Sequence, residues 1–68
     1  MMMYNFEFMK KGKNKPTLEV NLMMPTVDEA IDRCRMLYAL RGKVFKAETI
    51  RVREDGSPKI VYSYPERT

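Results

Sequence analysis

The chain has 68 residues and a net charge of +4, from 13 basic and 9 acidic side chains. A chain this short fits one domain, residues 1–68, with a core that supplies about 3–5 kcal/mol of net stability at most. It contains no histidine and one cysteine, which excludes an internal disulfide and the common zinc frameworks.

The sequence also carries no signal for crossing a membrane or for secretion. No stretch approaches the ~20 apolar residues of a membrane span. The opening MMMYNF lacks the basic start and long apolar run of a secretion signal. A lone cysteine fits a reducing compartment, so we expect a cytoplasmic protein.

Residues 4–8 and 18–24 alternate between apolar and polar side chains, which is typical of half-buried strands. One antiparallel register pairs their apolar residues: Phe8 with Leu18, Phe6 with Val20, and Tyr4 with Leu22. The same register places Lys11 opposite Lys15 and leaves 12–14 as a tight loop.

Residues 25–42 change to a helical period. Thr26 and Glu29 have the spacing of a capping box, in which each side chain bonds the other residue's amide. Gly42 is expected to end the helix. One face is apolar and consists of Val27, Ala30, Ile31, Cys34, Leu37 and Tyr38.

Two further strands are predicted, over 43–54 and 59–65. A two-residue loop would pair Ile50 with Val61, whereas a three-residue loop at 54–56, with Gly56 in a left-handed conformation, pairs Ile50 with Ile60. We favour the second because it groups Val52, Tyr62 and Tyr64 with Ile50. Phe45 and Ala47 lie out of phase with these residues, which predicts a bulge near 48–49.

The predicted order is ββαββ, a two-layer α+β domain. One helix packs on one face of a four-stranded, mainly antiparallel sheet. The pattern leaves the strand order open.

Few residues suggest catalysis. Cys34 sits within the apolar helix face, so we interpret it as a core residue and not as a nucleophile. Acids in the first turns of the helix, at 28, 29 and 32, suit a divalent ion but are also the usual complement of the helix dipole. The sequence therefore predicts a non-enzymatic protein with no metal and no cofactor.

Glu7 lies opposite Glu19 in the first-hairpin register, on the face away from the aromatic residues. Like charges there are unfavourable unless a cation lies between them. The two could form a general acid/base pair. We instead expect Arg51 or Arg53 to neutralise them across the sheet.

Methionines are expected on the uncovered sheet face, and two more large apolar residues on the outer side of the helix. Such residues suit an adaptable protein interface or the seam of a homodimer, and scattered surface apolar residues are also common. The interface candidates are Met3, Met9, Met23, Met36 and Leu40.

A lysine cluster accounts for the whole excess of positive charge, because the rest of the chain carries 9 basic and 9 acidic residues. It either keeps the protein soluble or contacts the backbone of a nucleic acid, alone or within a nucleoprotein complex, with affinity that falls as salt rises. The cluster is Lys10, Lys11, Lys13 and Lys15; Arg41, Lys43 and Lys46 form a second cationic group, and Arg51 and Arg53 a further candidate contact.

The run from 25 to 50 resembles part of the small phage-encoded anti-CRISPR inhibitors of type I surveillance complexes. T-x-x-E-A opens a helix and R-G-K-V-F-K-A-E-T-I leads into a hairpin. The resemblance implies a non-enzymatic inhibitor, active in the bacterial host cell, that occupies the positively charged or RNA-presenting surface of a defence complex. It is carried by Ala30, Gly42, Val44, Glu48 and Thr49 and does not extend to the lysine hairpin.

Overall fold

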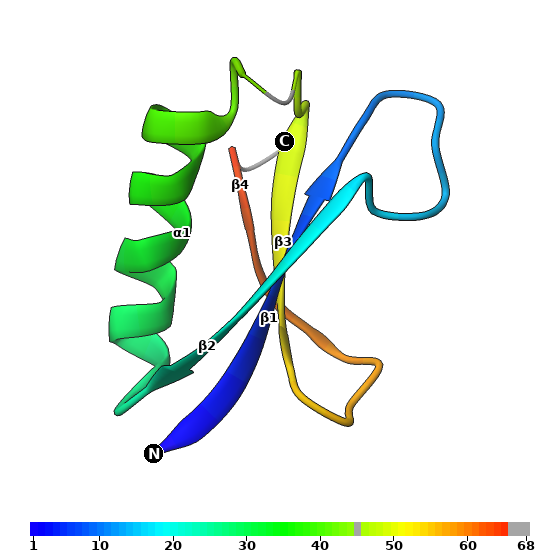
Figure 1. Ribbon diagram of the computed structural model, residues 1–68. Helices are drawn as coiled ribbons and strands as arrows, with labels where there is room; N and C mark the ends of the chain where they lie inside the picture. Colours follow the sequence, from blue (N-terminus) through cyan, green and yellow to red (C-terminus); the bar gives the residue numbers. More distant parts are fainter. Residues whose placement is uncertain (45, 66–68) are drawn as a thin grey trace.

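The computed structural model of the chain describes residues 1–44 and 46–65. Its elements are β1 (Met2–Met9), β2 (Leu18–Met24), α1 (Val27–Arg41), β3 (Thr49–Glu54) and β4 (Ile60–Tyr64). The strands form one antiparallel sheet in the order β2-β1-β3-β4, and α1 covers one face (Figure 1). The predicted two-layer α+β fold is confirmed.

The first hairpin has the predicted register, with Phe6 opposite Val20 and Tyr4 opposite Leu22. The ladder stops at the Phe8–Leu18 pair, however, so Lys11 does not pair with Lys15. Lys13 N donates to Lys10 O at 3.1 Å, which closes a turn before the lysines can form a ladder. Pro16 has no amide hydrogen to donate on the opposite side. The connection is therefore an open loop over residues 10–17 and not a tight three-residue turn.

Helix α1 has the predicted start and end. Glu29 N donates to Thr26 Oγ1 at 3.2 Å, so Thr26 is the N-cap. The helix ends at Arg41, although Gly42 keeps right-handed dihedral angles (φ −55°, ψ −45°) in place of a left-handed cap. Ala30 and Cys34 are buried, but Val27, predicted for the same face, is 41% exposed.

Between α1 and β3 the chain forms a turn and not the predicted beginning of a strand. Ala47 N donates to Gly42 O at 2.8 Å, and Lys46 adopts φ 52°. Strand β3 starts at Thr49, which lies opposite Met9, while Glu48 N donates to Met9 O at 2.8 Å. Two consecutive residues, 48 and 49, therefore face Met9, which agrees with the bulge predicted there. Part of that prediction rested on Phe45, which lies outside the described residues.

The second hairpin keeps Val52, Tyr62 and Tyr64 on the side of Ile50, as predicted, but Ile60 lies opposite Arg53 and the predicted pairs are wrong. Ile50 lies opposite Tyr64 and Val52 opposite Tyr62, so Ile50 does not pair with Ile60. A turn forms at Glu54–Ser57, with Gly56 at φ 81°, and β4 begins only after Pro58. The register shifts by one residue at Val52/Arg53, where Val61 is the extra residue of a bulge.

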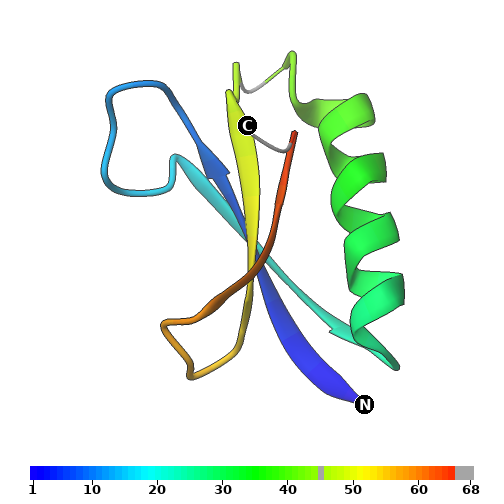
Figure 2. The same ribbon diagram turned by 180° about the vertical axis from the view of Figure 1, so that it is seen from behind.

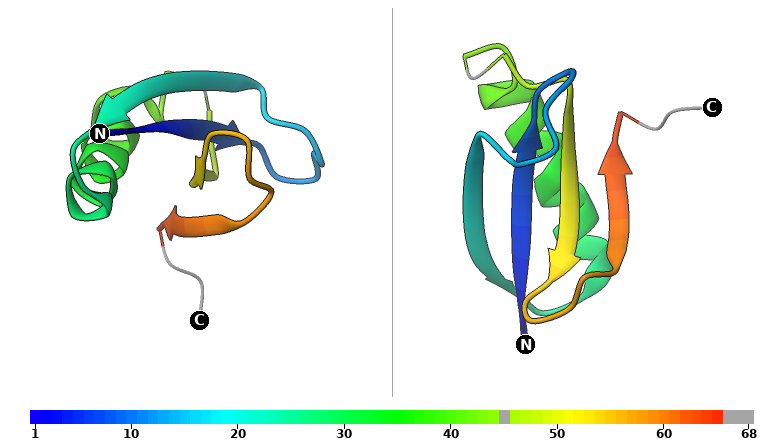
Figure 3. Two further views of the ribbon diagram at one scale, coloured as in Figure 1. Left: turned by 90° about the horizontal axis from the view of Figure 1, so that it is seen from below. Right: turned by 90° about the vertical axis from the view of Figure 1, so that its right-hand side faces the viewer.

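The core lies between the sheet and α1. It contains Tyr4, Phe6, Phe8, Ala30, Cys34, Ile50 and Val52. Strand β1 is buried from Tyr4 to Met9 on both of its faces, because it is central and long side chains cover the face away from the helix. Figure 3 shows this open face with β2 at one edge of the sheet and β4 at the other. None of the described helices is long and apolar enough to cross a membrane.

Candidate functional site: a cationic end beside an ion-paired sheet face

An ion-pair network occupies the centre of the open sheet face. Glu7 on β1 is 5% exposed and lies between Glu19 on β2 and Arg51 on β3. Arg51 Nη2 lies 3.0 Å from Glu7 Oε1, and Arg53 Nη2 lies 3.1 Å from Glu7 Oε2. Each oxygen of the buried carboxylate therefore accepts a charge-assisted hydrogen bond from a different arginine.

Arg53 has several partners in this network. Besides Glu7, its Nη2 lies 3.6 Å from Glu19 Oε1, and its Nη1 donates to Ser57 O at 2.9 Å. This arrangement confirms the prediction that arginines of the second hairpin neutralise the opposed glutamates. It also means that Arg53, predicted as a contact for a partner, has its guanidinium engaged within the protein.

The open face is therefore polar and charged at its centre. Met9, predicted as an exposed interface residue, is 9% exposed, and Met3 is half-buried. The other three interface candidates are exposed, at 48% for Met23, 51% for Met36 and 69% for Leu40, but they lie on β2 and on α1 and not on one surface.

The lysine loop, residues 10–17, protrudes from the end of β1 and β2. Gly12 has φ 79° at the turn, and Thr17 N closes the loop by donating to Phe8 O at 2.9 Å. Lys11, Lys13 and Lys15 are exposed and Lys10 is half-buried. Among the described residues, none of these four forms a salt bridge. Their charges are available to an external anion.

The second cationic group lies at the same end of the molecule. Arg41 ends α1, and Lys43 and Lys46 belong to the turn that follows it. This turn lies beside the start of the lysine loop, because Glu48 N donates to Met9 O at 2.8 Å and Met9 directly precedes Lys10. Figures 1 and 2 show the loop and the C-terminus of α1 at one end. We call Lys10, Lys11, Lys13, Lys15, Arg41, Lys43 and Lys46 the cationic end.

Acidic residues gather at the opposite end. The first turns of α1 carry Asp28, Glu29 and Asp32, and the β3–β4 turn carries Glu54 and Asp55, with Lys59 in the same loop. We call these five acids the acidic end. The separation of charge follows from the antiparallel path of the chain, which brings the start of α1 and the end of β3 to one side (Figure 2).

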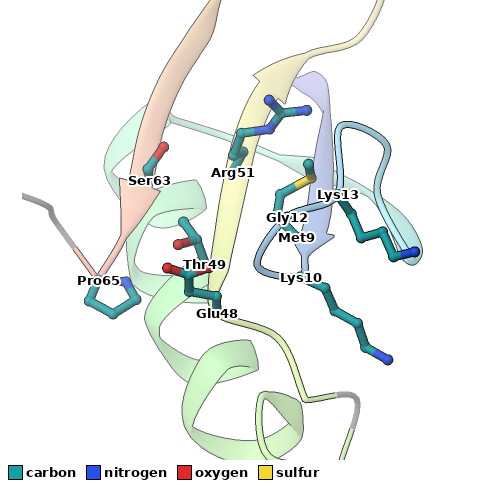
Figure 4. Close-up of a pocket in the computed structure, with 9 residues that line it drawn as sticks. All are labelled: Met9, Lys10, Gly12, Lys13, Glu48, Thr49, Arg51, Ser63 and Pro65. Atoms are coloured by element: carbon teal, nitrogen blue, oxygen red, sulfur yellow. The ribbon is translucent and has the colours of Figure 1, made fainter.

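A pocket of about 470 Å³ lies at the base of the lysine loop, between the ends of β1, β3 and β4 (Figure 4). Arg51 stands between two lysines and Ser63 in this view. Arg51 Nε is buried and has no hydrogen-bond partner among the described residues. The lining residues are Met9, Lys10, Gly12, Lys13, Glu48, Thr49, Arg51, Ser63 and Pro65.

The chemistry of this pocket suits anion binding better than catalysis. Lysine ammonium groups and the hydroxyls of Thr49 and Ser63 can donate hydrogen bonds to phosphate oxygens. Among the described lining residues, Glu48 contributes the one carboxylate. No group of three or more His, Cys, Asp or Glu side chains that could hold a metal ion occurs within 1–44 and 46–65.

Cys34 is a core residue, as predicted. Its side chain is fully buried, and Sγ lies 3.6 Å from Ile50 O. Burial raises the pKa of the Cys34 thiol to about 12, while the positive charge of Arg35 opposes that shift. The thiol therefore stays protonated, in contrast to a nucleophilic cysteine.

Sequence reasoning missed the pocket and the charge separation. Both depend on which strands are neighbours, which the sequence pattern did not determine. No family model, curated protein or solved structure matches this chain.

Proposed function

We propose that this protein is a non-enzymatic binding protein whose cationic end contacts the phosphate backbone of a nucleic acid. The observation that carries the proposal is the meeting of two groups of basic residues, separated by more than twenty positions in sequence, at one end of the fold. A concentrated positive potential attracts polyanions, and neutralised phosphates release counterions.

The distribution of aromatic side chains favours contact with backbone over contact with bases. Tyr4, Phe6 and Phe8 are buried beneath α1. Tyr62 and Tyr64 are half-buried on the same side of the sheet and lie near Arg35 of α1. Proteins that stack bases on a sheet need exposed aromatic rings. We therefore expect binding that depends little on sequence.

The pocket supports a specific place for one phosphate. Lys10 and Lys13 line one side, with ammonium groups that extend outward from the pocket in Figure 4, and Thr49 and Ser63 supply hydroxyl donors. Arg51 already bonds Glu7 through one guanidinium nitrogen, so it contributes mainly to the local potential. Glu48 lies in the same lining and selects against highly charged anions, which suits a singly charged phosphodiester better than a phosphate monoester.

The anti-defence role implied by the resemblance is a narrower form of this proposal. In that form the bound backbone belongs to the RNA or DNA held by a type I surveillance complex. The exposed loop, residues 10–17, would reach the nucleic acid there. Binding to such a complex that survives nuclease treatment would instead assign the contact to protein.

The test compares two double variants with equal loss of charge. Lys11→Gln/Lys13→Gln removes two exposed charges from the cationic end, and Arg33→Gln/Lys59→Gln removes two exposed charges elsewhere. Fluorescence anisotropy with labelled DNA and RNA at low salt should show about tenfold weaker binding for the loop variant. The control should change affinity by less than about twofold.

The same measurement shows whether the lysine loop binds nucleic acid or only keeps the protein soluble. If wild-type protein binds neither DNA nor RNA at low salt, the proposal is wrong. If both variants weaken binding equally, the contact is a diffuse effect of net charge, and the loop has no particular role.

A homodimer through the open sheet face is the alternative function. The buried ion-pair network on that face, centred on Glu7, weakens this alternative, because the accessible methionines there, within the described part of the chain, are half-buried Met3 and exposed Met23.

A further inference from the structure

The two edges of the sheet differ in how they are protected against pairing. Edge strand β4 has five residues, contains the bulge at Val61, and lies between Pro58 and Pro65. Edge strand β2 has seven residues, pairs with β1 without a register shift, and contains no proline, lysine or arginine. Short length, bulges, proline and lysine are the usual protection of an edge. Strand β2 is longer than β4 and has no bulge and no lysine, although Pro16 and Pro25 flank it as Pro58 and Pro65 flank β4.

Hydrogen bonds on the two sides of β1 show which residues of β2 turn their backbone outward. Met3 O and Met9 O accept from amides on the β3 side, at 2.9 and 2.8 Å, whereas Phe8 O accepts from Thr17 N on the β2 side at 2.9 Å. Backbone direction alternates along an antiparallel strand. Leu18, Val20, Leu22 and Met24, the partners of even-numbered β1 residues, therefore bond β1, while Glu19, Asn21 and Met23 present their N–H and C=O groups at the open edge.

We propose that β2 pairs antiparallel with β2 of a second copy of this chain, about a twofold axis at Asn21. This register places Asn21 opposite Asn21 and Glu19 opposite Met23 of the second copy. Every residue of β2 then has a partner, and the outward backbone groups at 19, 21 and 23 are all paired. A register centred on Glu19 would oppose two carboxylates, and one centred on Met23 would pair fewer residues.

Apolar side chains on the helix side of β2 support the same register. Leu18, Val20, Leu22 and Met24 are only half-buried, because α1 packs mainly against β3 and β4. In the dimer Leu18 would lie opposite Met24 of the second copy, and Val20 opposite Leu22. The pairing therefore buries apolar surface that the monomer leaves partly exposed.

Charge complementarity favours a second copy over an unrelated strand. Lys15 precedes β2 by three positions and Asp28 follows it by four, and both are exposed. Antiparallel pairing of β2 brings the cationic end of each copy beside the acidic end of the other, at both ends of the seam. The inference does not depend on the proposed nucleic-acid contact, because the pairing uses the backbone edge and the register of β2, whatever the lysines bind.

Disulfide trapping tests the register. Asn21→Cys should form a covalent dimer under mild oxidation, because paired residues there have Cα atoms about 5.5 Å apart, within the range for disulfides. Glu19→Cys and Met23→Cys should each form no disulfide-linked dimer alone, because the two copies of each residue lie about 13 Å apart, but should cross-link when mixed. Cys34 is fully buried and serves as an internal control for non-specific oxidation. Cross-linking of Met23→Cys alone as fast as Asn21→Cys would overturn the register.

Light scattering tests the dimer itself. Wild-type protein should show twice the chain mass of 8.1 kDa. Asn21→Lys, at an exposed position, should return the mass to that of one chain by opposing two lysines at the axis. Leu40→Lys adds the same charge on the exposed helix face and should leave the dimer intact. A wild-type monomer at the highest soluble concentration, or a dimer unaffected by Asn21→Lys, would reject the proposal.

Discussion

Glu7 and Arg51 lie directly opposite each other on β1 and β3, with Arg51 Nη2 3.0 Å from Glu7 Oε1. The carboxylate is buried at the centre of the open sheet face and also bonds Arg53. This pair joins strands that are more than forty positions apart in the chain. The stability of the sheet therefore depends on a polar contact as well as on the core beneath α1.

Replacing Glu7 by Gln should lower the free energy of unfolding by about 1–3 kcal/mol, because two arginines lose their shared counter-ion. The effect is below that of a fully buried pair, since the arginine side chains are 34% and 24% exposed. Glu19→Gln is the control, because Glu19 is 40% exposed and 3.6 Å from Arg53. It should cost less than about 1 kcal/mol in urea unfolding. Equal losses for both variants would contradict the role of Glu7.

Cys34 should react with a thiol reagent only as fast as the protein unfolds. Its thiol is fully buried, and its pKa is raised from 9.0 to about 12. At pH 8, adding urea should therefore speed the reaction in parallel with the loss of helical circular dichroism. Rapid reaction of the folded protein would show that the thiol is accessible.

The same raised pKa predicts how stability changes in alkali. Below pH 9 both the folded and the unfolded chain keep the thiol proton, so Cys34 contributes no pH dependence. Between pH 9 and about 12 the unfolded chain loses that proton first, so unfolding becomes easier as pH rises. Cys34→Ala should be less stable at pH 8 but should lose less stability over this range. The measurement is urea unfolding at a series of pH values.

Gly56 occupies a position that few other residues tolerate. It has φ 81° in the turn between β3 and β4, where an added Cβ would meet no other atom within 4 Å. Gly56→Ala should therefore cost about 1 kcal/mol through backbone strain alone. Gly56→Asn should cost less, because asparagine adopts left-handed conformations more readily. Thermal unfolding of the two variants checks this order, and a larger loss for asparagine would contradict it.

The salt dependence of nucleic-acid binding should report the lysine loop directly. Each phosphate contact adds about 0.7–0.9 to the slope of log affinity against log salt concentration. Replacing Lys10, Lys11, Lys13 and Lys15 by Gln should therefore reduce that slope by about 3 if each contacts one phosphate. The melting temperature should change little, because these side chains form no salt bridge among the described residues. An unchanged slope would exclude the loop from the contact.

Local patterns in the sequence predicted most of the elements and the register of β1 with β2 up to the Phe8–Leu18 pair. Alternation at 4–8 and 18–24 allows a single pairing that buries the aromatic residues, because a shift of one position would expose them. That register also places Glu7 opposite Glu19, and two neighbouring carboxylates need a cation between them, which predicted the arginine contacts. The start of α1 at Thr26 and its buried face at Ala30 and Cys34 were also predicted from residues a few positions apart. Turns were predicted less well: the lysine loop and the second hairpin both depart from their expected pairs beside a proline that cannot donate to a ladder.

By itself, the sequence determined which residues form strands and helix, which faces are apolar, and where the basic residues cluster along the chain. Only the tertiary structure decided that β1 lies at the centre and β2 at an edge, and that the two basic groups meet at one end, opposite the acids. The physical reason is that alternation and capping act between residues a few positions apart. Strand order depends on the free energy of contacts between segments that are distant in the chain, and a local sequence pattern does not predict those contacts.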